Sequence, residues 1–446
     1  MSHSQTKQTL LFIAPSAYPL GGVQTWLDYL LPGLQVKGYR AVLALTSGHH
    51  HSVSNYLATH KLSQIQTLSL SSPTGTIEGR VESIELAIQD IQPDIIVVVN
   101  VIDAYQAVNN LRRRRLSKAR IVTSIHGIQE DLFAGIKVNS SVIDAVVSTN
   151  RLTQKLINKT SNIDASRSLY AQYGVELPLA PDTKGAGKIF TIAYAGRIEE
   201  SQKRIADLLQ IFSKTLRQID KIRILIAGSG EDMPALEDWL KKESQYATKI
   251  NYLGVIKPEY VAESIYAKAD VLLLTSQWET GPIVAWEAMS HGVCLVSSRY
   301  VGYFEEGSLV DGENCLLFDI GNIDAAVEKI HQARDISKRG RINAGAKELV
   351  VNKYSEQKSI GAWAECFNAI CAIPPKSYSN KATLNIDNGR LTSVLRSVLG
   401  ITGLRLAERL RHFYPKKFKH LSAGSEWPHS YPGHNAEQLS LDLEEK

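Results

Sequence analysis

Short apolar runs alternate with longer stretches of helical periodicity along the first part of the chain. The apolar runs predict β-strands at Thr9–Ala14, Ala41–Leu45, Asp94–Val99, Arg120–Ser124 and Ala145–Ser148. After the first strand, apolar side chains recur at helical spacing from Val23 to Leu34, and we expect Pro32 and Gly33 to kink or shorten that helix. Strands separated by helices predict βαβ units, which pair their strands in a parallel sheet.

The pattern stops over Glu176–Lys188, where Pro, Gly and Ala residues interrupt it, and we interpret this segment as a linker. The alternation then restarts, with strands predicted at Ile189–Ala195, Ile222–Ala227, Ile250–Leu253, Val271–Thr275 and Val293–Ser297. The sequence therefore predicts an α/β protein with two tandem doubly wound domains, over residues 1–176 and 189–358. A helix over 359–372 and a tail over 373–446 follow them.

Composition and charge set the class of protein. Of the 446 residues, 44% are hydrophobic and 21% are charged, which excludes a disordered, collagen-like or disulfide-scaffold protein. The net charge of +5 is small, but residues 389–421 carry eight basic side chains and one acidic side chain, so the remainder is slightly acidic. We therefore do not expect the body of the protein to bind nucleic acid.

The basic segment over 389–421 also carries apolar residues between its basic ones. This pattern is typical of a helix that lies on an anionic membrane surface. A helix that docks on the body of the protein, or on a partner, would use the same pattern. The tail therefore raises the hypothesis of peripheral binding at the inner face of the membrane.

No apolar run approaches the roughly 20 residues that a membrane-spanning helix needs, and the longest one, Ile95–Val99, ends at Asn100. The N-terminus lacks the anatomy of a signal peptide, and the four cysteines lack the spacing of metal ligands. We therefore expect a cytoplasmic protein without a cysteine-bound metal.

The strongest chemical signal is the segment Glu279-Thr-Gly-Pro-Ile-Val-Ala-Trp-Glu287, which joins an apolar strand to a helix. Gly281 permits an open turn there, and Pro282 suits the start of a helix. The N–H groups and the positive dipole end of that helix suit a phosphate or a sugar oxygen. Glu279 would lie at the carboxyl end of the strand, where open α/β sheets bind their ligands.

Glu287 lies on a helix that is apolar nearly all round, so a buried carboxylate there must be hydrogen-bonded. The two hydroxyls of a ribose are a natural bidentate partner. The structural alternative is a buried Glu287 that caps a neighbouring backbone, with Glu279 as a loop residue in solvent.

A second signal, Gly196-Arg197-Ile-Glu-Glu-Ser-Gln-Lys203, also follows a strand and precedes a helix. Arg197 offers a planar fork and Lys203 a point charge, and together these fit a diphosphate. An ordinary solvated basic turn is the alternative, because glutamates lie between the two cations.

The first domain carries two weaker signals. Gly21 and Gly22 lie between a strand and a helix, where backbone N–H groups could approach a ligand or simply form a turn. His126 follows the strand at Arg120–Ser124, at an end where a cleft is expected, although a lone histidine can equally be structural.

Two tandem Rossmann-like domains with G-R-x(5)-K and then E-x(7)-E resemble the retaining glycosyltransferases of family 4, which have the GT-B fold with two domains facing across a cleft. The resemblance covers about Thr9 to Ala372. It implies a metal-independent enzyme, with no metal site and no bound cofactor, that moves a hexose-type sugar from a nucleotide-diphosphate sugar to a hydroxyl of a glycan or lipid-linked acceptor. The acceptor would bind on the side of the N-terminal domain, and the donor on the side of the C-terminal domain.

The resemblance also implies roles for particular residues. Arg197 and Lys203 would grip the diphosphate, Glu287 would bind the ribose, and Glu279 and His126 would contact the transferred sugar. The remaining donor contacts would come from backbone or apolar groups at Gly22, Val255, Ile256, Gly281 and Ile283.

One departure and three alternatives remain. Relatives often have Gly-Gly after the strand that follows the second glutamate, whereas this chain has Val301-Gly302-Tyr303, so Tyr303 could narrow the donor pocket. A non-catalytic sugar-nucleotide-binding partner or sensor on the same fold is the main alternative function. An epimerase or a phosphorylase of this architecture is a further one.

Overall fold

The computed structural model describes residues 8–16, 22–48, 52–72, 77–178, 189–380 and 427. These residues form two compact units. The first contains the described residues up to Thr149, Thr153–Ala171 and those from Ile360 onward, and the second contains Asn150–Leu152 and Gln172–Ser359.

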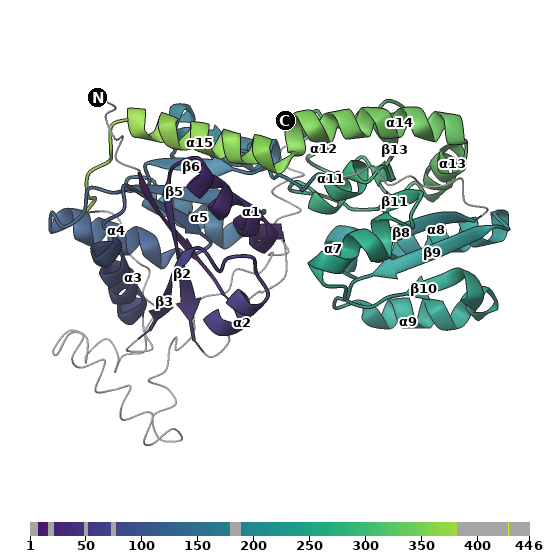
Figure 1. The fold of residues 1–446 in the computed structure, drawn as a ribbon, viewed down its shortest axis with the longest axis horizontal. Helices are drawn as coiled ribbons and strands as arrows, with labels where there is room; N and C mark the ends of the chain where they lie inside the picture. The colour runs from purple at the N-terminus through teal and green to yellow at the C-terminus, as the bar shows by residue number, and fades with distance from the viewer. Residues whose placement is uncertain are drawn as a thin grey trace, which may run out of the picture. The chain divides into compact units, whose positions relative to one another are not determined.

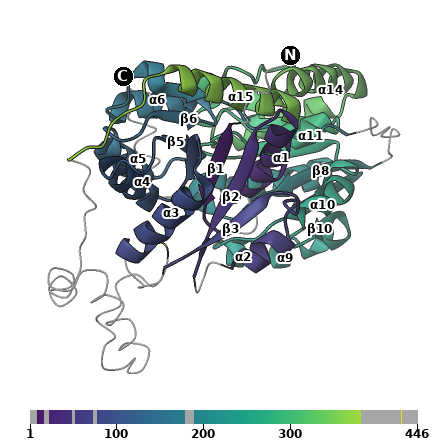
Figure 2. The same ribbon diagram turned by 60° about the vertical axis from the view of Figure 1, so that its left-hand side comes forward.

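The first unit is built on a parallel sheet with strand order β3-β2-β1-β4-β5-β6-β7 (Figures 1 and 2). Its strands are β1 (Thr9–Ala14), β2 (Arg40–Ser47), β3 (Gln66–Ser71), β4 (Ile95–Val99), β5 (Arg120–Ile125), β6 (Ala145–Ser148) and β7 (Ser168–Tyr170). The order of the strands reverses between β1 and β4, which pair directly from Leu10 with Ile95 to Ile13 with Val98. Such a switch point leaves a crevice at the carboxyl ends of the strands.

Helices connect the strands of the first sheet (Figure 1). They are α1 (Gly22–Val36), α2 (Val53–Ala58), α3 (Ile77–Ile91), α4 (Asp103–Arg113), α5 (Glu130–Asn139), α6 (Arg151–Thr160) and the short 3-10 turn η1 (Ala165–Arg167). Of the expectation that Pro32 and Gly33 kink or shorten α1, the shortening is wrong, because the helix runs through both residues to Val36. A glycine is required at position 33, because a Cβ there would lie 2.3 Å from a side-chain atom of Ile360.

An aromatic cluster ties the last helix, α15 (Glu356–Ala372), to the first unit. Trp363 of α15 lies 4.9 Å from Trp26 of α1, and Phe367 lies 6.4 Å from Phe12 of β1, measured between ring centroids. All four side chains are fully buried. Because α15 begins in the second unit and continues in the first from Ile360, this cluster fixes the part of the helix that belongs to the first unit.

The second unit has a parallel sheet with strand order β10-β9-β8-β11-β12-β13 (Figure 1). Its strands are β8 (Phe190–Ala195), β9 (Ile222–Ala227), β10 (Ile250–Tyr252), β11 (Val271–Leu274), β12 (Cys294–Ser298) and β13 (Leu316–Phe318). Its helices are α7 (Glu200–Lys203), α8 (Ile205–Gln218), α9 (Met233–Lys242), α10 (Pro258–Val261), α11 (Ile283–Ser290), α12 (Tyr303–Glu306), α13 (Ile323–Ala333) and α14 (Ile336–Leu349), with the short helical turns η2 (Ser244–Lys249), η3 (Ala262–Tyr266) and η4 (Val350–Tyr354).

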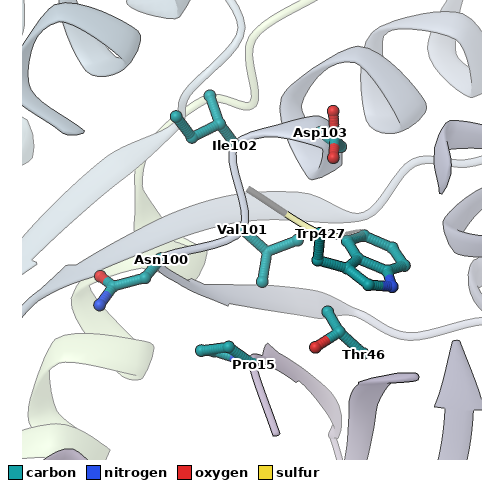
Figure 3. Close-up of a pocket in the computed structure, with 7 residues that line it drawn as sticks. All are labelled: Pro15, Thr46, Asn100, Val101, Ile102, Asp103 and Trp427. Carbon is teal, nitrogen blue, oxygen red and sulfur yellow. The ribbon is translucent and has the colours of Figure 1, made fainter. Parts of the chain in front are cut away.

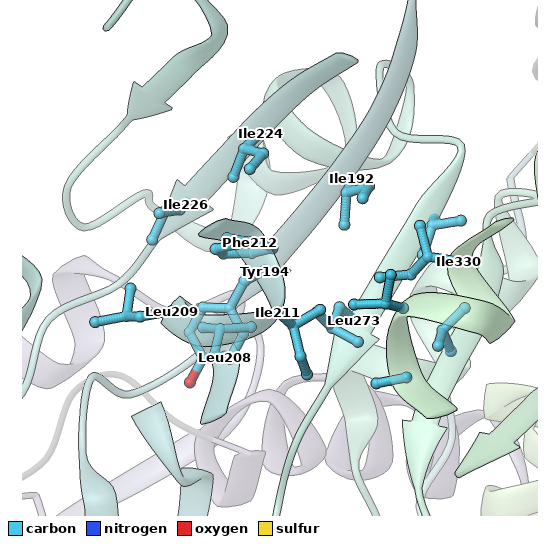
Figure 4. Close-up of a cluster of buried hydrophobic side chains, with 14 of the residues drawn as sticks. Ile192, Tyr194, Leu208, Leu209, Ile211, Phe212, Ile224, Ile226, Leu273 and Ile330 are labelled. Atoms are coloured by element: carbon cyan, nitrogen blue, oxygen red, sulfur yellow. The ribbon is translucent and has the colours of Figure 1, made fainter. Parts of the chain in front are cut away.

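Both faces of the second sheet are apolar. Ile192 and Tyr194 of β8 join a core with Leu208 and Phe212 of α8, as Figure 4 shows. The intervening Ala193 belongs to a separate core on the opposite face, with buried residues of α11. This alternation within one strand places helices on both faces of the sheet. The predicted fold of two doubly wound α/β domains is therefore confirmed.

The sequence analysis did not predict three of the strands, β3, β7 and β13. The linker residues 179–188 and the basic segment 389–421 lie outside the described residues. Residues 374–379 of the tail are described, and they bind the first unit through Lys376, whose N–H donates to Asp144 Oδ1 at 2.6 Å. None of the helices in the described ranges combines the length and apolar character needed to cross a membrane.

The loops after β8 and β9 touch through Gly228. This residue has a φ of +129°, and a Cβ on it would lie 1.8 Å from the carbonyl oxygen of Gly196. We therefore expect Gly228→Ala to lower the free energy of unfolding by about 1–3 kcal/mol. The matched control is Gly340→Ala in α14, where a Cβ meets no atom within 4 Å, and it should raise stability by about 0.5–1 kcal/mol. Urea unfolding of both variants checks this prediction. Equal changes in the free energy of unfolding for the two substitutions would contradict it.

Candidate functional site

The second sheet reverses its strand order between β8 and β11, and the two strongest sequence motifs follow these two strands. The Gly196–Lys203 segment leaves β8 and ends in α7, and the segment after β11 leads into α11. The switch point therefore brings together, within one unit, residues that lie more than 70 positions apart in the sequence.

Lys203 and Glu279 bind each other. The Lys203 ammonium donates to Glu279 Oε1 at 2.6 Å, and the Ser276 hydroxyl donates to the same oxygen at 2.6 Å. Glu279 is 6% exposed and the Lys203 side chain 14%. The alternative of a loop carboxylate in solvent is therefore excluded for Glu279, which is buried and held by a cation from the other motif.

Gln202 also links the segment after β8 to the segment after β11. Its amide nitrogen donates to the Trp278 carbonyl at 3.0 Å and lies 3.4 Å from Glu279 Oε2, and its amide oxygen accepts from Arg197. Gln202 thus contacts both the arginine and the glutamate of the two motifs. It was not predicted as a site residue, because a glutamine carries no sequence signal apart from its place between Arg197 and Lys203.

We call Arg197, Gln202, Lys203 and Glu279 the charged group. Arg197 is its exposed cation, with about half of its side chain accessible to solvent. It donates to Glu199 Oε2 at 2.5 Å. Burial raises the pKa of Glu199, and the charges of Arg197 and Lys203 oppose this rise. The arginine is thus oriented by its neighbours while part of its guanidinium remains accessible to an anion.

The start of α11 has backbone N–H groups that can donate hydrogen bonds next to the charged group. Pro282 is the N-cap and Ile283 the first helical residue, one position later than expected for the proline. Gly281 before them has a φ of +93°, a conformation that strains other residues. Among the described residues, the N–H groups of Gly281 and Ile283 have no hydrogen-bond acceptor. An oxyanion could therefore use them.

Glu287 lies about one helical turn after Ile283 on α11. It is held by Tyr266, whose hydroxyl donates to Glu287 Oε2 at 2.6 Å. Burial raises the pKa of Glu287, and the tyrosine hydrogen bond partly offsets that rise. Glu287 Oε1 has no hydrogen-bond partner in the described part of the chain. One carboxylate oxygen thus fixes the side chain and the other can accept a further hydrogen bond. Tyr266 was not predicted as a site residue.

The expected nucleobase contacts lie in the loop after β10. Val255 is 61% exposed, whereas Ile256 packs against the core on one face of the sheet. Their side chains are apolar, so they could cover a ring but could not read its hydrogen-bonding edge.

Gly22 and His126 belong to the first unit, so they are described apart from the residues above. Gly22 is exposed at the first position of α1, and its neighbour Gly21 lies outside the described residues.

His126 is 7% exposed, and its ring centroid lies 4.4 Å from that of Trp26. Its Nε2 lies 3.0 Å from the Ser124 hydroxyl, which itself donates to the Val98 carbonyl at 3.2 Å. If the serine hydroxyl gives its proton to the Val98 carbonyl, Nε2–H is the donor to Ser124, so the pair of contacts favours the Nε2–H tautomer. Burial lowers the pKa of His126 to about 3.

In the part of the chain that the structure describes, no three His, Cys, Asp or Glu side chains are grouped so as to hold a metal ion. The polar groups at the β8–β11 switch point instead suit an anionic ligand: two cations, a set of backbone donors and a carboxylate with one available oxygen.

Residues 189–335 match the family model of the glycosyl transferases group 1. This range contains Arg197, Lys203, Glu279 and Glu287. The resemblance that the two motifs indicated is therefore confirmed for the second unit.

Two curated relatives match parts of the chain. N-acetyl-alpha-D-glucosaminyl L-malate synthase of Bacillus anthracis is 26% identical over 162 residues, covering 36% of this chain and 41% of that protein. Alpha-monoglucosyldiacylglycerol synthase of Acholeplasma laidlawii is 29% identical over 158 residues, covering 35% of this chain and 38% of that protein. The chain thus matches about two fifths of the length of these two relatives.

Solved structures of glycosyltransferases share the whole fold. The apo form of the lipopolysaccharide outer core galactosyltransferase WaaB has a TM-score of 0.64 and 17% identity, covering 81% of this chain and 99% of that one. Anabaena HepE in complex with UDP-glucose has a TM-score of 0.62 and 16% identity, covering 82% and 100%. These similarities show the GT-B architecture of two Rossmann-like domains.

His126 should stay neutral down to low pH. We expect its two ring nitrogens to keep the ¹⁵N shifts of an Nε2–H tautomer from pH 8 to pH 5 in the folded protein, with the resonances assigned by their loss in His126→Gln. An unfolded histidine binds a proton near pH 6.5, so the stability from this neutral site falls as pH drops from 6.5 towards 3, by up to about 1.4 kcal/mol per pH unit. A titration of these signals near pH 6.5 would contradict the account.

The buried ion pair should couple energetically. We expect Glu279→Gln and Lys203→Met each to lower the free energy of unfolding, and the double variant to lose about 1–3 kcal/mol less than the sum of the two. Urea unfolding of the four chains gives this coupling. Additive effects would show that the two side chains stabilise the fold independently.

Proposed function

We propose that this chain is a retaining glycosyltransferase that moves a hexose-type sugar from a nucleotide-diphosphate sugar to a hydroxyl of a glycan or lipid-linked acceptor, without a metal ion. The observation that carries the proposal is the charged group at the β8–β11 switch point. There the Lys203–Glu279 pair, the exposed fork of Arg197 and the N-terminus of α11 meet within one unit.

The chemistry of the leaving group explains why such a site is useful. When the bond from the sugar to the diphosphate breaks, negative charge develops on the phosphate oxygens. Cations and backbone N–H groups that are already in place stabilise this charge without reorganising. Arg197, Lys203 and the N–H groups of Gly281 and Ile283 would provide that stabilisation.

Glu279 is proposed as a positioning residue as well as a sugar contact. Its carboxylate fixes the Lys203 ammonium from one side, while Ser276 holds the carboxylate from the other. A diphosphate that approaches Lys203 would find the lysine already oriented. With one oxygen accepting two hydrogen bonds, Glu279 has only Oε2 for a sugar hydroxyl, so we assign it to positioning and not to covalent attack.

Glu287 is proposed to bind the ribose through Oε1. The Tyr266 hydroxyl holds Oε2 and sets the direction of the other oxygen. Hydroxyls of a ribose are suitable donors to it. The apolar surroundings of α11 would strengthen these hydrogen bonds by excluding water.

The acceptor class rests on the relatives. By their names, one relative synthesises a glucosaminyl malate and another synthesises alpha-monoglucosyldiacylglycerol. A third is a lipopolysaccharide 1,6-galactosyltransferase of Salmonella typhimurium, and the match covers 57% of its length. We therefore propose a glycan or lipid-linked acceptor. His126 is proposed to contact the sugar as a neutral hydrogen-bonding group, since its low pKa does not suit a charged acid.

Calorimetric titration with UDP, GDP and ADP, each with and without EDTA, tests the donor site. We expect one nucleotide to bind with the same affinity in the presence of the chelator, and Arg197→Ala to weaken it by about tenfold or more, since each charge-assisted hydrogen bond contributes about 1.5–3 kcal/mol. Loss of binding in EDTA would contradict the metal-independent proposal. No binding of any nucleotide would contradict the donor site itself.

The stereochemistry can be tested without knowing the acceptor. The sugar nucleotide that matches the bound nucleotide is incubated with the protein, and slow hydrolysis is followed by proton NMR. We expect the first sugar released to have the anomeric configuration of the donor, before mutarotation. Release of the opposite anomer would contradict a retaining reaction, and Glu279→Ala provides the control for contaminating hydrolases.

A further inference from the structure

The first unit has a surface at the amino ends of its strands β5 and β6. Arg120 begins β5 and Asp144 precedes β6, so these two residues mark that edge of the sheet. The pocket in Figure 3 lies at the opposite edge, where Pro15, Thr46 and Asn100 are at the carboxyl ends of β1, β2 and β4. A partner bound at the amino ends would therefore leave the ligand-binding edge of the sheet uncovered.

Three chain segments make up this surface, which we call the basic surface. They are the end of α4 with the loop after it (112–118), the end of α5 with the loop after it (137–142) and the segment after α15 (373–380). Together they contain seven basic residues and no aspartate or glutamate: Arg112, Arg113, Arg114, Arg115, Lys118, Lys137 and Lys376. The ionisable side chains that these segments contribute are therefore all of one sign.

A buried arginine joins the end of α4 to the loop after α5. The Arg112 guanidinium donates to the Val142 carbonyl at 2.8 Å and to the carboxylate of Asp144, and the side chains of this ion pair are more than nine-tenths buried. Arg112 is thus neutralised inside the unit. Arg113 and Arg115 are exposed instead, and they have no ion-pair partner in the described part of the chain. Their charges are available to a partner in solution.

Hydrogen bonds hold the segment after α15 against both helix ends. Asn109 of α4 binds the backbone of Ser379 twice: its amide nitrogen donates to the carbonyl at 2.9 Å, and its amide oxygen accepts from the N–H at 2.7 Å. The Lys376 ammonium donates to the Ser140 carbonyl, just past the end of α5, at 2.5 Å. Figures 1 and 2 show this segment running from the end of α15 toward α4. The three segments therefore form one continuous surface.

Exposed apolar side chains lie among the exposed cations. Leu116 is 45% exposed, Val138 55% and Tyr378 48%, and each comes from a different one of the three segments. Each is also within two residues of a basic residue in the sequence. A lipid interface accommodates both kinds of side chain, because it has charged head groups over an apolar layer. This combination favours an anionic lipid surface over a nucleic acid, whose backbone has phosphates without an apolar layer.

The tail continues from the same surface. Residue 380 is described and belongs to the third segment, and the sequence over 389–421 has eight basic side chains and one acidic side chain. The chain between residues 380 and 389 can span at most about 30 Å. The charge of the tail therefore begins within that distance of the basic surface, and both attract a partner of the same sign.

We propose that the basic surface binds an anionic lipid bilayer. The exposed cations contact the anionic head groups, and Leu116, Val138 and Tyr378 enter the boundary between the head groups and the acyl chains. The sequence pattern raised membrane binding for the tail, whereas this surface belongs to the folded first unit. The proposal does not depend on nucleotide binding by the second unit or on the reaction proposed for it.

Co-sedimentation of the full chain with vesicles tests the proposal. The vesicles contain phosphatidylcholine alone, or phosphatidylcholine with about one third phosphatidylglycerol. We expect the wild type to bind only the anionic vesicles. The variant with Arg113→Glu, Arg115→Glu and Lys118→Glu should bind them about 100-fold or more weakly, because each cation near such a surface contributes about fivefold to the affinity.

Matched variants in the second unit provide the controls. The variant with Lys221→Glu, Lys257→Glu and Lys268→Glu changes the net charge equally at exposed lysines, and it should bind within about threefold of the wild type because salt screens distant charges. For the apolar side chains, Leu116→Ser with Tyr378→Ser should weaken binding by about tenfold or more. Ile336→Ser with Tyr260→Ser, at two exposed positions of the second unit, should leave it unchanged.

Each contrary result overturns the proposal in a distinct way. Full binding by the basic-surface triple variant would show that the tail or another face binds the vesicles. An equal loss in the control triple variant would show an effect of net charge alone. Wild-type binding to a short DNA duplex but not to anionic vesicles would assign the surface to nucleic acid. Melting temperatures equal to that of the wild type exclude a loss of folding, and the UDP, GDP and ADP titrations test the proposed function separately.

Discussion

The second unit depends on one constraint: Glu279 is a buried carboxylate, and a buried carboxylate has to be paired and hydrogen-bonded. Lys203 and Ser276 meet that requirement, and Gln202 joins the same carboxylate to Arg197. Because these groups come from the loops after β8 and β11, pairing them fixes the two loops together. The cations are therefore held in place before any ligand binds, which is the condition for stabilising charge at low reorganisation cost.

The first unit uses burial in a different way. Its aromatic cluster joins β1, α1 and α15, and the same Trp26 that contacts Trp363 also contacts His126. A histidine packed between a tryptophan and a serine hydroxyl stays neutral and has a defined tautomer. The indole of Trp427 lines a pocket at the switch point of the same sheet. Apolar packing thus keeps His126 neutral.

The sequence was sufficient for the fold class because buried parallel strands are continuous apolar runs, such as Ile95–Val99. It missed β3, whose sequence Gln-Thr-Leu-Ser-Leu-Ser alternates with polar residues at a sheet edge, and the three-residue strands β7 and β13. The motifs located Arg197, Lys203, Glu279 and Glu287, but their partners Gln202 and Tyr266 are defined only by contacts made in three dimensions. Trp427 lies among polar residues, and no local pattern indicates the pocket that it lines.

The central claim is that the cations at the β8–β11 switch point bind a diphosphate. The most direct measurement compares the affinity of the bound nucleoside diphosphate with that of its parent nucleoside, in the wild type and in the Arg197→Ala, Lys203→Ala double variant. We expect the phosphates to improve wild-type affinity by about 100-fold or more, and this gain to fall below about tenfold in the double variant while nucleoside affinity is unchanged. A gain of equal size in both proteins would show that the diphosphate binds elsewhere and would contradict the account.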